Sequence, residues 1–113
     1  MEKYSEKRPW GNFEQFCKNE KCTVKMITVN PNEKLSLQYH NDRDEFWRVV
    51  LGSGVVVIRD EEIKCKENDE FFIQKGTNHR IITKDSMMKL LEISFGDFDE
   101  KDIIRLEDKY NRK

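Results

Sequence analysis

The chain has 113 residues, of which 36% are hydrophobic and 38% are charged, a composition that suits one compact globular domain. Its 21 basic and 22 acidic side chains leave a formal net charge of −1, so electrostatics give no reason to expect nucleic acid or a membrane as a partner. No apolar run approaches the ~20 residues that a membrane-spanning helix requires.

The cysteines and the N-terminal residues favour a cytoplasmic protein. There are three cysteines, Cys17, Cys22 and Cys65, and an odd number without CxxC spacing argues against both a disulfide framework and a zinc–thiolate site. We therefore expect reduced thiols. Residues 1–7 are polar and contain no apolar segment, so no signal peptide is predicted.

Short β-strands account for most of the chain, because apolar and polar residues alternate with a period of two. In chain order, strands are predicted over residues 23–29, 35–40, 45–51, 55–60, 63–65, 70–74, 79–83 and 89–95. Residues 99–110 fit either a short helix or a last strand. Many short strands separated by turn residues predict a single all-β sandwich or barrel.

Polar side chains occupy one face of the second predicted strand. Gln38 and His40 lie on this face, and Asp42 follows at the same spacing. Glu45 opens the next strand, and His79, the only other histidine, opens a later one. Polar groups buried in a barrel need partners, and a metal ion satisfies several of them at once. Mixed nitrogen and oxygen ligands suit Zn, Mn, Fe, Co or Ni in an open site that keeps room for water or substrate.

Two segments resemble the sequence motifs of the cupin superfamily. His40, Glu45 and Gly52 are similar to the first motif, His-x-His…Glu…Gly. Residues 74–79 are similar to the second motif, Pro-x-Gly-x-x-His, with Gln74 in place of the usual proline. The resemblance implies a small cupin, which is a double-stranded β-helix or jelly-roll barrel.

Further segments narrow the resemblance to type II mannose-6-phosphate isomerases, which are often the C-terminal part of bifunctional mannose-1-phosphate guanylyltransferases. The matching segments are residues 8–16, which lead into the domain, and residues 35–47, 76–80 and 102–110. The resemblance runs from Arg8 to Arg112. It implies that residues 1–113 form one cupin domain, with a tail over residues 99–113 that packs on the barrel or in a dimer.

Asp42 stands where cupins carry the second histidine of the first motif, and this leaves two readings. Asp42 could replace that histidine as a ligand in a more oxygen-rich site. Alternatively, the stretch from Gln38 to Arg43 resembles the Gln-x-His-x-Asp-Lys stretch of type I mannose-6-phosphate isomerases, in which Gln and His bind zinc together with a Glu and a later His. The ligands in this second reading, which we favour, are Gln38, His40, Glu45 and His79. Asp42 would then be free for acid–base chemistry.

The reaction implied by the resemblance interconverts mannose 6-phosphate and fructose 6-phosphate through an enediol, with a metal ion polarising the sugar oxygens. A base must move the carbon-bound proton, and Asp42 and Lys25 are the candidates. Arginine is well suited to hold the phosphate group. The substrate-binding candidates are Arg8, Arg43 and Arg80 for the phosphate, and Trp10 and Trp47 for the sugar ring.

Three functions are open on these observations. The first is a stand-alone, metal-dependent sugar-phosphate isomerase. The second, suggested by Asp42, is a non-catalytic, metal-containing cupin that binds a sugar phosphate or a nucleotide sugar. The third is another small cupin enzyme, such as a different isomerase or an epimerase, because the fold does not determine the reaction. We also expect a homodimer, since uncovered strand edges need a partner.

Overall fold

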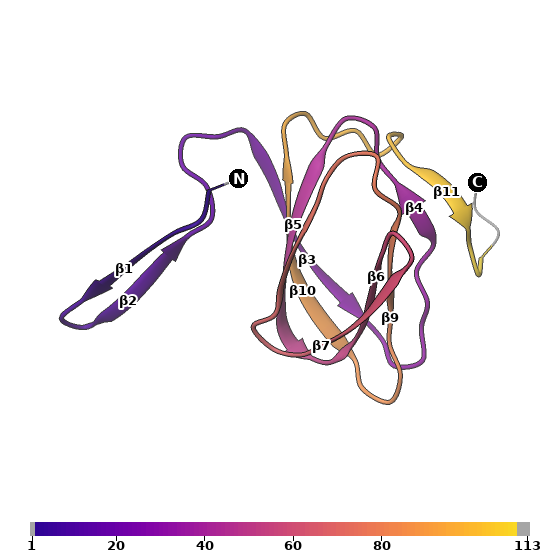
Figure 1. Ribbon diagram of the computed structural model, residues 1–113, viewed down its shortest axis with the longest axis horizontal. Coiled ribbons are helices and arrows are strands. Elements are labelled where there is room, and N and C mark those ends of the chain that lie inside the picture. Colours follow the sequence, from indigo (N-terminus) through magenta and orange to yellow (C-terminus); the bar gives the residue numbers. More distant parts are fainter. Residues whose placement is uncertain (1, 111–113) are drawn as a thin grey trace.

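The fold is a β-barrel with an attached hairpin (Figure 1). The computed structural model describes residues 2–110; residue 1 and residues 111–113, which end the expected tail, lie outside the described residues. Within that range every regular element is a strand, so the described part of the chain has no helix that could cross a membrane. The expected all-β domain is confirmed.

The strands form three antiparallel sheets. The hairpin consists of β1 (Tyr4–Arg8) and β2 (Gly11–Gln15). The second sheet has the order β3 (Cys22–Val29), β10 (Met88–Phe95), β5 (Asp44–Gly52) and β8 (Glu70–Ile73). The third sheet has the order β11 (Ile104–Glu107), β4 (Leu37–Tyr39), β9 (His79–Ile82), β6 (Gly54–Ile58) and β7 (Glu61–Cys65). The second and third sheets face each other and enclose the interior (Figure 1).

All eight predicted strands are present, with ends that differ from the prediction by at most two residues. The tail, for which a helix and a strand were both open, forms β11, which pairs with β4. The hairpin was not predicted. Its first strand is exposed at four of five positions, so it lacks the alternation that reveals a strand with a core behind it.

The two ends of the barrel interior differ in polarity, because the inward positions of each strand change character along its length. On β5 the inward positions run from Glu45 through Trp47 to Val49, and on β10 they run from Ser94 through Glu92 to Leu90. The apolar core fills one end; its buried members are Val29, Trp47, Val49, Val56, Cys65, Ile73, Ile81, Met88 and Leu90. The polar side chains gather at the other end, which we call the polar end.

The hairpin projects from the barrel and is attached at its base (Figure 1). Phe16, just after β2, packs on Phe46 with ring centres 5.3 Å apart. The Lys3 ammonium donates to Glu70 over 2.9 Å. The tip carries Trp10, which is 73% exposed. The hairpin therefore presents an aromatic side chain to its surroundings at a distance from the barrel.

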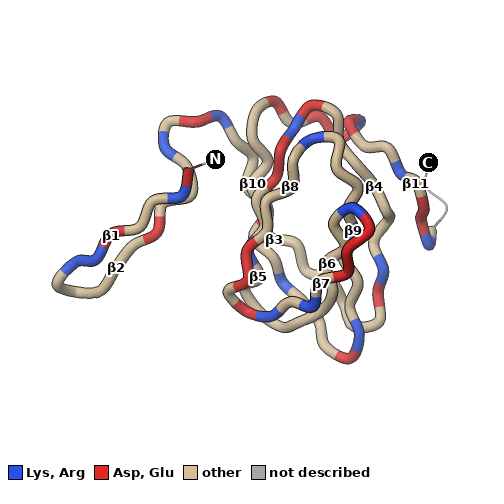
Figure 2. The backbone as a smooth tube through the Cα atoms, viewed as in Figure 1, with Lys and Arg blue, Asp and Glu red and all other residues tan. Residues whose placement is uncertain are grey.

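Charged residues of both signs are interspersed along the backbone, in the hairpin as well as in the barrel (Figure 2). The three cysteines are free; Cys17 and Cys22 are half-buried with their Sγ atoms 3.8 Å apart, and Cys65 is buried. Burial raises the pKa of the Cys17 thiol, which favours its protonated form.

Candidate metal centre

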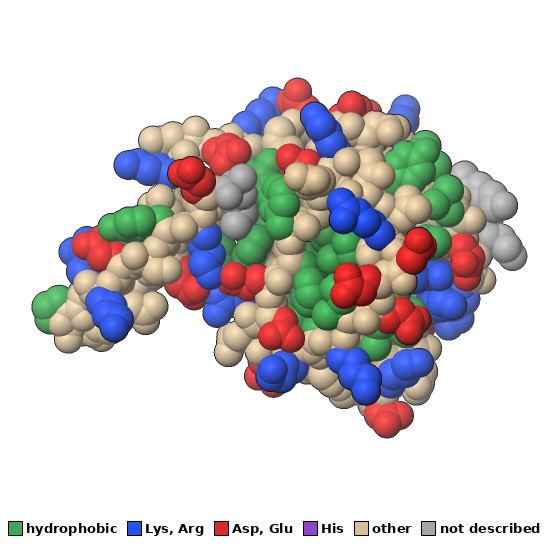
Figure 3. All heavy atoms as spheres, viewed as in Figure 1, with side chains coloured by type: hydrophobic (Ala, Val, Ile, Leu, Met, Phe, Trp, Pro, Cys, Tyr) green, Lys and Arg blue, Asp and Glu red, His purple; other side chains and the backbone are tan. Residues whose placement is uncertain are grey.

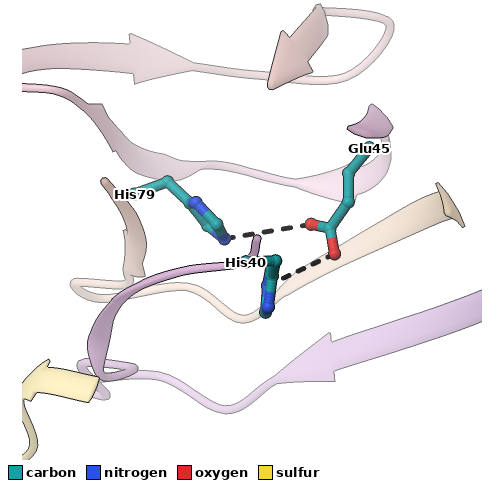
Figure 4. Close-up of side chains that lie close together, drawn as sticks. All are labelled: His40, Glu45 and His79. Atoms are coloured by element: carbon teal, nitrogen blue, oxygen red, sulfur yellow. Dashed lines mark ion pairs between the residues drawn. The ribbon is translucent and has the colours of Figure 1, made fainter. Parts of the chain in front are cut away.

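Three buried side chains converge at the polar end of the barrel: His40, just after β4; Glu45, on β5; and His79, at the start of β9 (Figure 4). One ligand atom from each residue lies within 4.8 Å of the other two. His40 Nε2 is 3.4 Å from Glu45 Oε2, and His79 Nε2 is 3.8 Å from Glu45 Oε1. His40 and His79 are 3% and 1% exposed, and no histidine is visible on the face drawn in Figure 3.

Both imidazoles are oriented by backbone carbonyl groups. His40 Nδ1 donates to the Asp102 carbonyl oxygen over 2.6 Å, and His79 Nδ1 donates to the Thr77 carbonyl oxygen over 2.8 Å. A carbonyl oxygen can only accept, so in each neutral ring the hydrogen is on Nδ1 and the lone pair is on Nε2. Both Nε2 atoms face the Glu45 carboxylate, which is the arrangement of histidines that bind a metal through Nε2.

His79 provides the test of whether these residues fit a metal ion. Its Nε2 atom is fully buried and has no hydrogen-bond partner, although a buried polar atom normally has one. Burial also lowers the pKa of His79, which keeps the ring neutral. A buried, neutral imidazole with an unused lone pair suits a cation ligand. The residues therefore fit one divalent metal ion, and their nitrogen and carboxylate donors are compatible with Zn, Mn, Fe, Co or Ni.

Arg43 contacts two of the three residues. Its Nε donates to Glu45 Oε2 over 2.9 Å, and its Nη2 lies 3.2 Å from His40 Nε2. The guanidinium thus balances the buried charge of Glu45 in the structure. Trp47 Nε1 donates to the other carboxylate oxygen of Glu45 over 3.1 Å. An ion bound by all three residues would replace the contact between Arg43 and His40.

The predicted ligand Gln38 lies next to His79. The two residues are directly opposite each other in the β4–β9 pairing, so their side chains share the inward face. Gln38 Oε1 accepts a hydrogen bond from Ser36 Oγ over 3.0 Å. Gln38 is therefore at the site, and its role as a fourth ligand stays a prediction.

Asp42 is placed differently from the expectation. Its side chain is exposed and lies outside the cluster of His40, Glu45 and His79. Strand β4 ends at Tyr39, so the alternation that was extended to Asp42 has already stopped. The structure thus gives Asp42 neither a ligand position nor a place among the buried groups of the site.

Lys25 is an exposed residue of β3 near the polar end, and its catalytic role stays a prediction. It is opposite Glu92 in the β3–β10 pairing, and its ammonium nitrogen is 4.0 Å from the centre of the Phe98 ring. The guanidinium carbon of Arg43 is 4.5 Å from the centre of the same ring. Lys25 and Arg43 therefore both contact the Phe98 ring. Arg43 also contacts Glu45, so this pair of cations lies beside the cluster.

None of the other four substrate-binding candidates reaches the cluster as an accessible group, and Trp10 lies at the tip of the projecting hairpin. Arg80 alternates with His79 on β9, and its side chain points outward, where Nη1 is 3.2 Å from Glu107. Arg8 is near the tip of the projecting hairpin, where it pairs with Glu6. Trp47 is close to the cluster, with its ring centre 5.3 Å from that of His79, but it is only 2% exposed and offers no open face for a sugar.

Several residues of the site escaped the sequence analysis. Glu92 is 7% exposed on the inward face of β10, where burial, followed by the charge of Glu45, raises its pKa to about 7. Asp102 holds the backbone next to His40: its carboxylate accepts from the N–H groups of Asn41 and Asp42 over 2.8 and 2.9 Å. The alternation of Leu90, Glu92 and Ser94 was a usable signal for Glu92. No local pattern pointed to Asp102.

Comparison with known proteins identifies the family. A family model described as "Mannose-6-phosphate isomerase C-terminal" matches residues 2–108. The chain belongs to this family. As a member it is 38% identical over 107 residues to the xanthan biosynthesis protein XanB of Xanthomonas campestris pv. campestris, and 37% identical over 107 residues to the mannose-1-phosphate guanylyltransferase ManC of Salmonella typhimurium. The alignments cover 93% of this chain but only 23% and 22% of those relatives, so it spans less than a quarter of their length.

Solved structures confirm the cupin barrel. The capsular polysaccharide assembling protein CapF from Staphylococcus aureus matches with a TM-score of 0.66 and 23% identity, over 95% of this chain and 33% of that one. A cupin protein from Bacteroides fragilis matches with a TM-score of 0.62 and 18% identity, over 69% of this chain and 70% of that one.

Proposed function

We propose that this cupin is a metal-dependent sugar-phosphate isomerase that interconverts mannose 6-phosphate and fructose 6-phosphate. The observation that carries the proposal is the buried set of His40, Glu45 and His79, with an unpartnered Nε2 atom, in a member of a mannose-6-phosphate isomerase domain family. A bound divalent ion would polarise the sugar oxygens and stabilise the negative charge that develops on them.

The residues around the cluster support an anionic substrate. Lys25 and Arg43 provide positive charge beside it, and arginine and lysine are the side chains that bind phosphate groups in proteins. A phosphorylated sugar is therefore the proposed small-molecule partner. The 21 basic and 22 acidic side chains of the whole chain nearly balance, so its net charge would not attract nucleic acid or a membrane surface. We therefore propose neither as a partner.

A homodimer belongs to the same proposal. The hairpin projects from the barrel, and two-stranded hairpins are marginally stable without further packing. Trp10 at its tip supplies apolar surface that a second copy can cover. Sedimentation at micromolar concentration should give twice the mass of the chain, and Trp10→Ser should shift the mass toward that of the monomer.

The function is tested by reconstitution with metal. The purified chain is stripped with a chelator, supplied in turn with Zn, Mn, Fe, Co or Ni, and assayed for fructose 6-phosphate formation from mannose 6-phosphate. We expect turnover that the chelator abolishes and metal restores. His79→Ala should lose the bound ion and the activity, whereas Asp42→Asn should retain the ion, because the Asp42 side chain lies outside the cluster.

Three outcomes would contradict the proposal. Absence of turnover with every metal would exclude this isomerase. Binding of mannose 6-phosphate or a nucleotide sugar without turnover would favour the non-catalytic cupin, and turnover of a different sugar would favour another isomerase or an epimerase.

A further inference from the structure

We propose that Glu92 is the carboxylate that carries the proton between C2 and C1 of the sugar. This inference rests on the proposed isomerase function. It assigns the proton transfer to a buried residue, in place of Asp42 or Lys25.

The position of Glu92 next to the metal candidates is set by the pairing of the strands. On β10, Ser94 pairs with Glu45, and Glu92, the next inward residue, pairs with Trp47 of β5 and Lys25 of β3. Residues two apart on a strand are about 7 Å apart, so Glu92 lies about that distance along β10 from Ser94, the residue opposite Glu45. Glu92 is not one of the three clustered metal candidates.

The two oxygens of Glu92 have different surroundings. Oε1 accepts a hydrogen bond from Ser94 Oγ over 3.3 Å, which orients the carboxylate. Oε2 accepts no hydrogen bond from residues 2–110, and it is not among the fully buried unpaired atoms of that range. Oε2 is therefore oriented yet open to a group that enters the polar end.

The other acidic candidates lack these properties. Glu45 and Glu92 are the two buried acidic residues of the described chain. Both oxygens of Glu45 are engaged, by Arg43 Nε and Trp47 Nε1, and both face the histidines. Asp42 is exposed and outside the cluster. Glu92 is thus the one buried carboxylate that combines nearness to the cluster with an unused oxygen.

The proposed step conserves atoms and electrons. Glu92 Oε2 takes the proton from C2 of the aldose, the C2–H electron pair forms the C1=C2 bond of the enediol, and the C1=O π pair moves to O1, which takes a proton from water. In the second half water takes the O2 proton, the O–H pair forms the C2=O bond, and the C1=C2 pair takes the proton of Glu92 onto C1. One carboxylate serves both carbons, and no oxidant or second reactant is consumed.

The test compares Glu92→Gln with the wild type, both loaded with the metal that best supports the wild type. Glutamine keeps the size of the side chain and removes the base. We expect kcat to fall by about 10²–10⁴-fold, the usual contribution of a positioned acid–base group. Exchange of the C2 deuterium of labelled mannose 6-phosphate into water should fall by the same factor. The metal content and the affinity for mannitol 6-phosphate, which has no carbonyl group to react, should remain within threefold.

Matched variants separate the possible results. Glu61→Gln, an exposed glutamate on β7, should keep wild-type turnover and exchange. Glu92→Asp, which retains a shorter carboxylate, should keep part of the activity. Wild-type-like turnover in Glu92→Gln would overturn this role while the proposed function stands, as would loss of exchange in Lys25→Met but not in Glu92→Gln. A wild-type chain without turnover would overturn both proposals.

Discussion

His40 and His79 each use one ring nitrogen to hold their orientation and leave the other for a ligand. The oriented nitrogen, Nδ1, donates to a backbone carbonyl group in both residues. Carbonyl groups of Asp102 and Thr77 do not change charge with pH, so the orientation does not depend on a titrating partner. The two Nε2 atoms then converge on one carboxylate, Glu45, and that of His40 also contacts Arg43. At this scale the site is a small number of fixed donors among buried side chains.

Glu92 provides a prediction about pH in the metal-free protein. Its pKa is raised from 4.5 to about 7 by burial and by the charge of Glu45. Between these values the folded state keeps a proton that the unfolded state releases, so the free energy of unfolding should fall as the pH rises from about 4.5 to about 7. At about 1.4 kcal/mol for each pKa unit, the total is on the order of 3 kcal/mol.

Urea unfolding of the wild type and Glu92→Gln across this pH range, with chelator present, measures that contribution. The difference in unfolding free energy between the two proteins should change across the range and become constant above it. His79, whose pKa burial lowers, contributes a slope of the opposite sign, but it is present in both proteins and cancels in the difference. A difference that stays constant with pH would contradict the prediction.

The sequence was sufficient for His40, Glu45 and His79 because each occupies an inward position at the end of a strand or just beyond it. The alternation of inward and outward side chains predicts which residues face the interior for as long as the strand continues. It failed for Asp42, because β4 ends three residues earlier and the chain bends there. It also could not show that Arg43 would join the cluster, since that contact depends on the path of the chain after the strand.

The C-terminal tail contacts the loop that follows β4 and carries His40. Asp102 lies just before β11, and it contacts three consecutive residues: the His40 ring, and the N–H groups of Asn41 and Asp42. Burial raises the pKa of Asp102, but the N–H groups of Asn41 and Asp42 together with nearby positive charge lower it overall. The ionised carboxylate is thus the form that the folded loop stabilises. The tail is therefore part of the site, although it contributes none of the three clustered ligands.

Removal of the Asp102 carboxylate should loosen this loop. Hydrogen bonds to a charged group contribute about 1.5–3 kcal/mol, so Asp102→Ala should lower the unfolding free energy by an amount in that range. Groups that orient metal ligands typically change metal affinity about 10–100-fold, and we expect a loss of that size. Urea unfolding and competition with a chelator measure the two effects. Asp85→Ala, at an exposed loop position, is the control, and equal metal affinities in the two variants would contradict the prediction.

The elements differed in how well the sequence predicted them, for a physical reason. Strands with the core behind them, such as β5 and β10, carry the alternation that burial imposes. The hairpin strands have no core behind them, so their residues show no such pattern. Strand β11 lies at the edge of its sheet and contains an irregularity in its pairing between Arg105 and Glu107, which obscured the period of two.

The molecule as a whole combines an apolar end, which supplies packing, with a polar end, which carries the chemistry. The apolar core includes Val49, Val56, Met88 and Leu90, all fully buried. Burying the Glu45 carboxylate at the polar end costs desolvation free energy, and its ion pair with Arg43 offsets this cost. The residues that pack the core and the residues that form the candidate metal centre are therefore different residues of the same strands.

Arg43→Met tests this division. Removing one partner of a buried ion pair typically costs about 3–5 kcal/mol, so the metal-free protein should lose stability on that scale. With a divalent ion bound, the ion itself compensates Glu45, and the loss should be smaller. Urea unfolding with chelator and with saturating metal provides the comparison, and Lys64→Met, at an exposed position of β7, is the control. An equal loss under both conditions would contradict the prediction.

The contact between His40 and Asp102 also sets a sequence of events in time. The two residues are separated by 62 positions along the chain. At a synthesis rate of about 5–20 residues per second, His40 emerges roughly 3–12 seconds before the residue that orients it is made. During that interval the His40 ring lacks the carbonyl group that it contacts in the folded chain. The loop that carries His40 and Asn41 therefore cannot make these contacts until residue 102 has been synthesised.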